Sequence, residues 1–256
     1  MLENLSNPKI SIVYITLDAE QYLAESLAMS RQLSDDILIV DSGSQDQTLM
    51  IAAQCKVKVI HQTWLGFAAQ KQLAIDSAQN NWVLFLDADE IISEAVVQEI
   101  PKLLSQNNLP SAFSFPRQNF FQGKWIKHGS WWPDRVVRLV NRTQGQMKDV
   151  KVHECWQTVG KVYTLQSVIK HYSYGSYSEL LQKADSYSSL AAQEKFAQGL
   201  DCATWSPLGH ALAAFIRLFV LKRGFLDGIE GAAIAYTSAL ASFMKYAKLQ
   251  ELHRNK

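Results

Sequence analysis

Short apolar runs alternate with helical segments over the first ninety residues of the chain. The runs predict strands, because they are rich in β-branched side chains and each ends in polar residues. This alternation predicts βαβ units and a largely parallel sheet, and strands this apolar are expected to be covered on both faces. The predicted strands are Ile10–Thr16, Ile37–Val40, Val57–His61 and Trp82–Leu86, and the predicted helices are about Tyr22–Arg31, Gln47–Gln54 and Ala68–Ala78.

The pattern changes after about residue 111, where short aromatic and basic segments predict antiparallel strands and loops. One such strand is expected from Val136 to Asn141, and the chain turns helical after Tyr177. We therefore expect one α/β domain over residues 1–175 and a helical extension over residues 176–256. The three helices predicted in the extension are Ser178–Gln198, Pro207–Lys222 and Asp227–Leu252.

Composition adds charge asymmetry to this picture. The 256 residues carry a formal net charge of +1. This value by itself gives no indication of a polyanionic partner, and we expect no nucleic acid to bind. Residues 1–100 hold 5 Lys and Arg against 14 Asp and Glu, whereas the remainder holds 20 against 10. A basic second half suits phosphate-bearing ligands or an anionic membrane face, although charge can also simply follow the solvated surface.

The cysteine pattern indicates a reducing compartment. Cys55, Cys155 and Cys202 are widely spaced and odd in number, so neither a disulfide framework nor a zinc spacing is visible. A charged-then-apolar leader is absent from the N-terminal residues, so we expect no secretory signal and a cytoplasmic location.

The fourth predicted strand ends in the triplet Asp87-Ala88-Asp89, followed by Glu90. Ligands bind at the carboxyl ends of strands in open α/β sheets. Clustered carboxylates there suit a hard divalent cation such as Mg²⁺ or Mn²⁺, which also grips substrate phosphates. The alternative is that Asp87 to Glu90 merely open and cap the next helix.

Polar residues also follow the first two strands, and these strand ends should meet the acidic triplet along one edge of the sheet. Thr16, Asp18 and Glu20 follow the first strand, and Asp41 and Gly43 follow the second. An acceptor such as Asp41 or Asp18 could pair with N–H donors of a base or with ribose hydroxyls. Gly43 permits a tight turn and a close backbone approach to a ligand.

Ordered segments along nearly the whole chain resemble the family 2 glycosyltransferases with a GT-A fold. The resemblance is greatest to the group of small bacterial β-1,4-glucosyltransferases that act on the lipopolysaccharide inner core. The segments that carry it are Val40–Thr48, Trp64–Lys71, Leu86–Glu90, Trp132–Leu139, Val152–Glu154, His171–Tyr174 and Gly224–Gly228.

This resemblance implies a Rossmann-like, mostly parallel sheet with helices on both faces, with a nucleotide-binding half over about residues 1–100 and an acceptor half over about 101–175. It implies a nucleotide-sugar donor, with UDP-glucose favoured, and transfer of the hexose with inversion at the anomeric carbon. Asp41 would contact the nucleobase, and Asp18 or Glu20 would line the same pocket. Asp89 would bind the Mg²⁺ or Mn²⁺ that bridges the diphosphate, with Asp87 nearer the ribose or behind the metal ligand.

Inverting transfer also needs a general base for the acceptor hydroxyl. The resemblance makes Glu154 the candidate, because the family places a catalytic acid downstream of the metal triplet. His153 is the competitor, or a partner that orients Glu154 or touches the metal. The remaining alternative is that the two form an ordinary polar loop pair.

Several cationic and aromatic residues have two open interpretations. Arg135 or Arg138 could meet the diphosphate or an acceptor phosphate through the planar guanidinium, or could be a surface strand residue. Lys71 could hold phosphate, although a solvated helix lysine is the more usual case. Trp131 and Trp132 offer flat faces to a sugar ring, whereas aromatic pairs more often pack in a core.

The segment Ala211–Leu221 is strongly apolar, but it is too short to span a bilayer and Arg217 interrupts it. Lys222 and Arg223 follow directly. We expect an amphipathic helix docked on the inner face of the cytoplasmic membrane, with a helical cap or a dimer interface as the alternative.

The sequence thus predicts transfer of a hexose to a lipopolysaccharide core saccharide, which would be lipid-linked. The competing hypotheses are a lipid-phosphate carrier or an exopolysaccharide as acceptor, a nucleotidyltransferase, and a non-catalytic membrane-surface scaffold.

Overall fold

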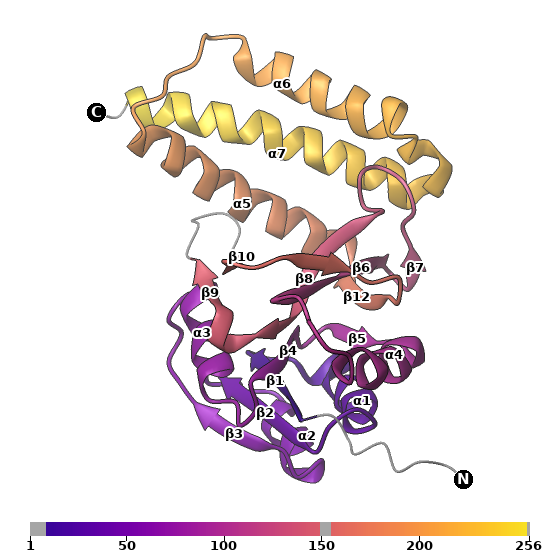
Figure 1. Cartoon of the computed structure of the whole chain (residues 1–256). Coiled ribbons are helices and arrows are strands. Elements are labelled where there is room, and N and C mark those ends of the chain that lie inside the picture. The colour runs from indigo at the N-terminus through magenta and orange to yellow at the C-terminus, as the bar shows by residue number, and fades with distance from the viewer. Residues whose placement is uncertain (1–8, 149–154, 255–256) are drawn as a thin grey trace. The chain divides into compact units, whose positions relative to one another are not determined.

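A computed structural model of the chain describes residues 9–148 and 155–254 (Figure 1). The chain divides into two compact units. The first comprises residues up to 117 together with 135–171, and the second comprises 118–134 together with residues from 172 onward. The predicted boundary near residue 175 stays a prediction, since 118–134 also group with the C-terminal helices.

The first unit begins with the four predicted parallel strands, in the spatial order β3-β2-β1-β4. In the registers of the ladders, Thr16 lies opposite Asp41 and Ile15 lies opposite Asp87, so the carboxyl ends of β1, β2 and β4 meet at one edge of the sheet. All seven predicted elements of this region are present. Their bounds are β1 Ile10–Thr16, α1 Glu20–Arg31, β2 Asp36–Asp41, α2 Thr48–Gln54, β3 Lys58–His61, α3 Phe67–Asp76 and β4 Trp82–Asp87.

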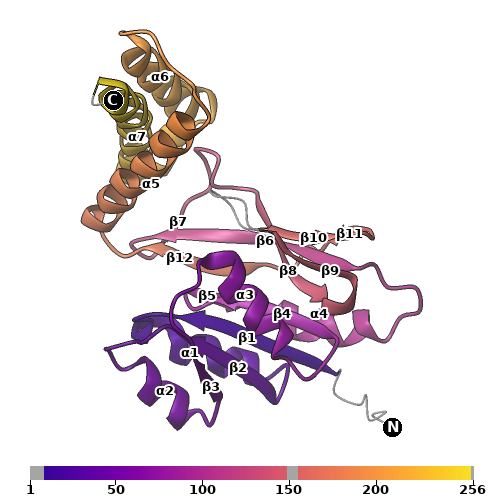
Figure 2. The same cartoon turned by 90° about the vertical axis from the view of Figure 1, so that its left-hand side faces the viewer.

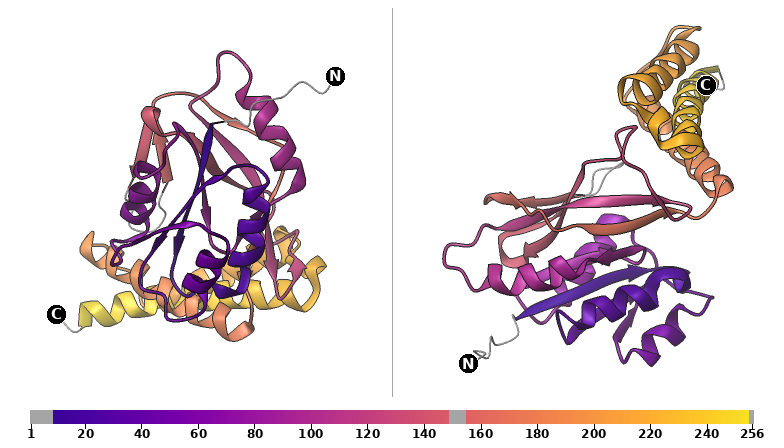
Figure 3. Two further views of the ribbon diagram at one scale, coloured as in Figure 1. Left: turned by 90° about the horizontal axis from the view of Figure 1, so that it is seen from below. Right: turned by 90° about the vertical axis from the view of Figure 1, so that its right-hand side faces the viewer.

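Both faces of these strands are buried, as their continuous apolar character predicts. Successive side chains of a strand point to opposite faces. Ile12 and Tyr14 therefore join a core cluster with Leu23 of α1, whereas Val13 joins a second cluster with Ile75 of α3. The left view of Figure 3 shows helices on both sides of the strands.

The acidic triplet does not cap a helix. Glu90 begins a short strand, β5 (Glu90–Ile92), and the next helix, α4 (Glu94–Leu104), starts only after Ser93. The helix-capping alternative for Asp87 to Glu90 is therefore wrong. Strand β5 is not apparent from the sequence pattern, because three residues are too few to show a period. Helix α4 is not among the predicted elements, although its buried residues Val96 and Ile100 have the spacing of an amphipathic helix.

The antiparallel half of the sheet completes the order β3-β2-β1-β4-β8-β6-β12-β5. Strand β8 runs antiparallel to β4, and β12 runs antiparallel to β5. The prediction of antiparallel strands after residue 111 is confirmed. The elements of this region are β6 Ala112–Phe121, β7 Lys124–Trp125, β8 Asp134–Asn141, η1 Arg142–Gln144, β9 Gly145–Lys148, β10 Cys155–Thr158, β11 Val162–Thr164 and β12 Ile169–Tyr174. Of these, β9 and β10 form a separate antiparallel sheet, β11 runs parallel to β6, and η1 is a 3₁₀ helix.

The helices of the second unit lie side by side, with α7 packed against both α5 and α6 (Figures 1 and 2). Three predicted helices are present, but the middle one changes character after Phe215, where a π-helical turn begins. The bounds are α5 Tyr177–Ala197, α6 Ser206–Phe215, η2 Ile216–Leu221, η3 Gly224–Asp227 and α7 Gly228–Arg254. Within the described ranges, no helix combines the length and apolar character needed to cross a bilayer.

Candidate functional site

The carboxylate of Asp41, at the end of β2, organises the turn that follows it. Asp41 is fully buried and accepts hydrogen bonds from the Thr16 hydroxyl (2.8 Å), the Ser44 hydroxyl (2.5 Å) and the backbone N–H groups of Gly43 (2.9 Å) and Ser44 (3.0 Å). Gly43 adopts φ +101°, which favours glycine. The four donors fill the acceptor capacity of a carboxylate and fix the backbone of the turn.

These bonds also set the protonation state of Asp41. Burial alone raises the pKa of a carboxyl, but hydrogen bonds from Ser44, Thr16 and Gly43 outweigh burial and hold the pKa of Asp41 below its ordinary value. The group is therefore ionised at neutral pH, and the site contains a fixed negative charge behind the turn.

Two further acids tie the loop after β1 to the loop after β2. Asp18 accepts a hydrogen bond from the Gln45 N–H (2.7 Å), and Glu20 accepts one from the Gln47 N–H (3.0 Å). In return, the Glu20 N–H donates to Asp46 (2.9 Å). Asp18 is exposed and has a backbone φ of +49°. This left-handed conformation is uncommon for a residue other than glycine, although Asp adopts it more readily than most. The structure thus brings Thr16, Asp18, Glu20, Asp41 and Gly43 together, as predicted from the convergence of strand ends.

We expect Asp41→Asn to lower the free energy of unfolding by about 1–3 kcal/mol at pH 7, because a neutral amide weakens four hydrogen bonds in a buried place. The lowered pKa means that the carboxylate stabilises the fold above its ordinary pKa of 3.8, and that this contribution is lost as pH falls through the folded-state pKa. Urea unfolding at several pH values measures both effects.

The matched control for this experiment is Asp18→Asn. Asp18 is exposed, and Asn tolerates a positive φ as well as Asp does, so we expect a change within about 0.5 kcal/mol. Equal losses in the two variants, or a loss for Asp41→Asn that persists unchanged at acidic pH, would contradict the role given to the Asp41 charge.

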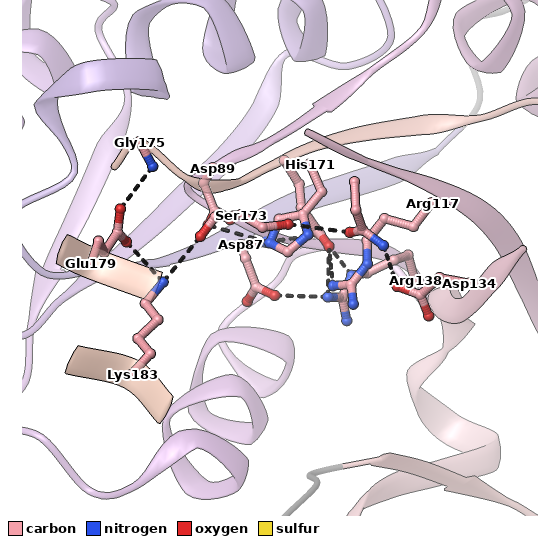
Figure 4. A network of polar contacts seen from close by, with 12 residues as sticks. Asp87, Asp89, Arg117, Asp134, Arg138, His171, Ser173, Gly175, Glu179 and Lys183 are labelled. Carbon is pink, nitrogen blue, oxygen red and sulfur yellow. Dashed lines mark hydrogen bonds and ion pairs between the residues drawn. The ribbon is translucent and has the colours of Figure 1, made fainter. Parts of the chain in front are cut away.

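The acidic triplet at the end of β4 forms a second cluster, in which Asp87 is held by two cations. Its Oδ1 lies 2.7 Å from Lys71 Nζ. Its Oδ2 accepts a 2.7 Å bond from Arg138, which Figure 4 shows as a dashed line. Burial opposes the charge, but Lys71 and Arg138 outweigh it and hold the pKa of Asp87 well below its usual range. The expectation of a solvated Lys71 is wrong, because its side chain is only 3% exposed and faces Asp87.

Glu90 is the charged neighbour of the triplet to which the predicted motifs assign no role. It is fully buried and accepts bonds from Arg138 Nε (2.7 Å), Arg138 Nη2 (2.8 Å) and Arg117 Nη1 (3.0 Å). Its Oε2 also accepts the backbone N–H of Asp87 (3.2 Å). Burial raises the pKa of Glu90, but the charge and hydrogen bonds of Arg138 and the charge of Arg117 together outweigh burial and hold the pKa below its ordinary value. This carboxylate thus anchors the first residue of the triplet.

Asp89 differs from Asp87 and Glu90 because one of its carboxylate oxygens has no hydrogen-bond partner among the described residues. Its Oδ2 lies 3.4 Å from His171 Nε2, and its Oδ1 is buried without a hydrogen-bond partner among the described residues. His171 reaches this position because it lies opposite Glu90 in the β12–β5 ladder. Figure 4 shows Asp89 and His171 side by side.

A divalent cation fits this oxygen. Mg²⁺ is usually held by one or two carboxylates plus waters and substrate phosphates, so it needs no protein cage. Within the described ranges, no group of three or more His, Cys, Asp or Glu side chains could hold a metal ion. Asp89, with His171 beside it, could therefore supply the protein ligands only if water or substrate phosphate completed the coordination.

The two arginines of β8 lie in different surroundings, because positions three apart on a strand face opposite sides. Arg138 is buried against Asp87 and Glu90, whereas Arg135 is exposed. The guanidinium of Arg138 is therefore directed at the carboxylates of Asp87 and Glu90. Of the two arginines, Arg135 is the one whose side chain lies on the surface.

The aromatic pair before β8 takes part in packing. Trp131 lies against Tyr174, with ring centroids 5.8 Å apart, and Trp132 meets Trp125 edge to face at 5.3 Å. The core-packing interpretation thus has direct contacts in its favour. Glu154 and His153 lie outside the described residues, so the assignment of the general base stays a prediction.

Comparison with known proteins gives the family. Residues 11–160, more than half of the chain, match the model of glycosyl transferase family 2. The chain is 29% identical over 255 residues to an uncharacterized glycosyltransferase of Rickettsia typhi, covering 95% of this chain and 87% of the relative. It is 26% identical over 251 residues to the lipopolysaccharide core biosynthesis glycosyltransferase LpsC of Rhizobium meliloti, covering 95% and 93%.

Among solved structures, TarS of S. aureus in complex with UDP is 13% identical, with a TM-score of 0.48 over 96% of this chain and 91% of that chain. The predicted fold class is confirmed in the mixed sheet with helices on both faces and in the helical C-terminal extension. From the family match over residues 11–160, the chain belongs to glycosyl transferase family 2 and is a glycosyltransferase.

Proposed function

We propose that the protein transfers a hexose, with glucose favoured, from a UDP-sugar to a saccharide of the lipopolysaccharide core, with inversion at the anomeric carbon. Support comes from the resemblance of its ordered motifs to the inner-core glucosyltransferase group. Further support comes from the 26% identity to a relative named for lipopolysaccharide core biosynthesis. The acceptor would be lipid-linked, and the enzyme would work at the inner face of the cytoplasmic membrane.

The observation that carries the proposal is the buried Oδ1 of Asp89, just after β4, which has no hydrogen-bond partner in the part of the chain that the structure describes. Asp89 would hold Mg²⁺ or Mn²⁺, with His171 beside it. The cation, when bound, would neutralise charge on the departing diphosphate. Asp87 and Glu90 would keep the backbone of the triplet in place, because Lys71, Arg138 and Arg117 clamp both carboxylates.

The nucleoside would lie on the interlocked loops after β1 and β2. Exposed Asp18 and the backbone near Gly43 are available to the base and ribose. The predicted contact of the base with Asp41 requires an exchange, because four internal donors already fill that carboxylate. A base N–H could replace the Ser44 or Thr16 hydroxyl, each of which can rotate away.

Glu154→Gln tests the general base. We expect the transfer rate to fall about a hundredfold or more, because a positioned base contributes on the order of 10²–10⁴ in rate. Donor affinity should stay within a few-fold, since Glu154 would act on the acceptor. The measurement is transfer rate beside calorimetric affinity for UDP with Mn²⁺. Retained transfer in this variant would move the base role to His153 or elsewhere, which His153→Gln then distinguishes.

A substrate panel tests the whole proposal. The protein is incubated with UDP-glucose and other nucleotide sugars, Mg²⁺ or Mn²⁺, and either a core oligosaccharide, a polyprenyl phosphate or an exopolysaccharide fragment. Transfer to the core oligosaccharide with release of UDP is the expected result. Transfer only to another acceptor would overturn the acceptor class, and release of pyrophosphate would indicate a nucleotidyltransferase.

A further inference from the structure

Helix α6 and the π-helical turn after it present apolar side chains to solvent. Leu208, Leu212, Ile216 and Val220 recur every four residues and are 53%, 62%, 41% and 50% exposed. A surface helix normally turns its apolar stripe to the core and polar residues outward. Here the opposite side of α6 packs on α7, and the outward side is also apolar.

The π-helical turn extends this stripe. Its i→i+5 bonding, seen from Lys222 N–H to the Arg217 carbonyl at 2.8 Å, gives more residues per turn than an α-helix. Val220 and Leu221 therefore both follow Ile216 on the outward side, and Leu221 is 70% exposed. We call the set Leu208, Leu212, Ile216, Val220 and Leu221 the apolar ridge.

Charge at the ridge has one sign. The stretch 206–225 contains Arg217, Lys222 and Arg223 but no Asp or Glu. All three cations are exposed. The first acids after this stretch, Asp227 and Glu230, are occupied: Asp227 accepts the backbone N–H of His128, and Glu230 pairs with Lys124. The first acid before it, Asp201, accepts the backbone N–H of Cys202. Trp205, 75% exposed at the start of α6, adds an aromatic residue of the kind enriched at bilayer interfaces.

We propose that the apolar ridge and its three cations form a docking surface for an anionic phospholipid bilayer. The ridge would enter the boundary between head groups and acyl chains, while Arg217, Lys222 and Arg223 would extend to lipid phosphates. A second copy of the chain is less suitable as the occupant, because a symmetric contact would bring like charges face to face. This inference deepens the proposed function, in which the acceptor is lipid-linked, by naming the surface that reaches the lipid.

Vesicle sedimentation of the full chain tests the surface. We expect binding to vesicles of phosphatidylethanolamine with phosphatidylglycerol, little binding to pure phosphatidylcholine, and weaker binding as salt rises. Leu212→Gln with Leu221→Gln should lower the affinity for the anionic vesicles at least about tenfold, since both side chains would lose burial in lipid. Lys222→Gln with Arg223→Gln should remove the preference for anionic lipid.

The matched control is Leu181→Gln with Leu190→Gln on α5, where the leucines are 50% and 54% exposed. This control should bind vesicles as the parent protein does. Equal loss in both leucine pairs, or no binding by the parent, overturns the proposal. A parent dimer that the ridge variant dissociates would make the ridge an interface between copies instead. Hydrolysis of UDP-sugar in the absence of lipid, measured on every variant, separates failure of docking from failure of the proposed function.

Discussion

Asp89→Asn should reduce sugar transfer by more than about a thousandfold while the protein stays folded. An amide keeps the size of the side chain but removes the charge that a divalent cation requires. A cation on the diphosphate contributes several kcal/mol to the transition state, and each 1.36 kcal/mol corresponds to about tenfold in rate. Asp89 is the member of the triplet to test, because its Oδ1 has no partner among the described residues.

The rate is measured with UDP-glucose and Mn²⁺, and metal-dependent UDP binding by calorimetry gives a second readout. The control is Asp35→Asn, which changes a carboxylate that is 88% exposed at the opposite end of β2. Turnover above about a tenth of the parent rate in folded Asp89→Asn protein would contradict the assignment of the cation to Asp89. Loss of turnover with unchanged metal-dependent UDP binding would contradict it as well.

The strands of the first unit are predictable because their apolar content is continuous and their ends are polar. Both faces of these strands are covered, so residues such as Val13 and Ile39 are buried whichever face they point to. The strands can therefore be predicted without knowing which helices or strands pack against them. The convergence of Thr16, Asp41 and Asp87 then follows from parallel pairing alone. The sequence therefore carries the fold class and the edge at which the site is built.

The residues around Asp87 and Asp89 come together through strand pairing that cannot be predicted from the sequence pattern. His171 reaches Asp89 through the antiparallel β12–β5 register, and Arg138 reaches Asp87 from β8, a strand that pairs with β4. Lys71 looks like any helix lysine until the helix packs and leaves it beside Asp87. A usable signal was present in Glu90, since an acid between a buried strand and an apolar Ile-Ile pair is unusual unless it is paired.

Arg138→Met should lower the free energy of unfolding by about 3–5 kcal/mol, because it leaves the buried carboxylate of Glu90 without its main partner and Asp87 with only Lys71. Met has a similar apolar stem, so the loss reports the guanidinium rather than a cavity. Arg138 donates to Glu90 through two nitrogens and to Asp87 through one, and its side chain is only 9% exposed. Urea unfolding followed by circular dichroism gives the measurement.

Arg135→Met supplies the matched control, on the same strand but with an exposed side chain, and should change stability by no more than about 0.5 kcal/mol. The cause of the loss is then separated by adding Glu90→Gln to Arg138→Met. Gln removes the buried charge and still offers an oxygen to Arg117, so the double variant should be more stable than the sum of the two single losses implies, by about 0.5–3 kcal/mol. Strict additivity would mean that Arg138 and Glu90 stabilise the fold independently, and that the arginine does not hold the triplet through Glu90.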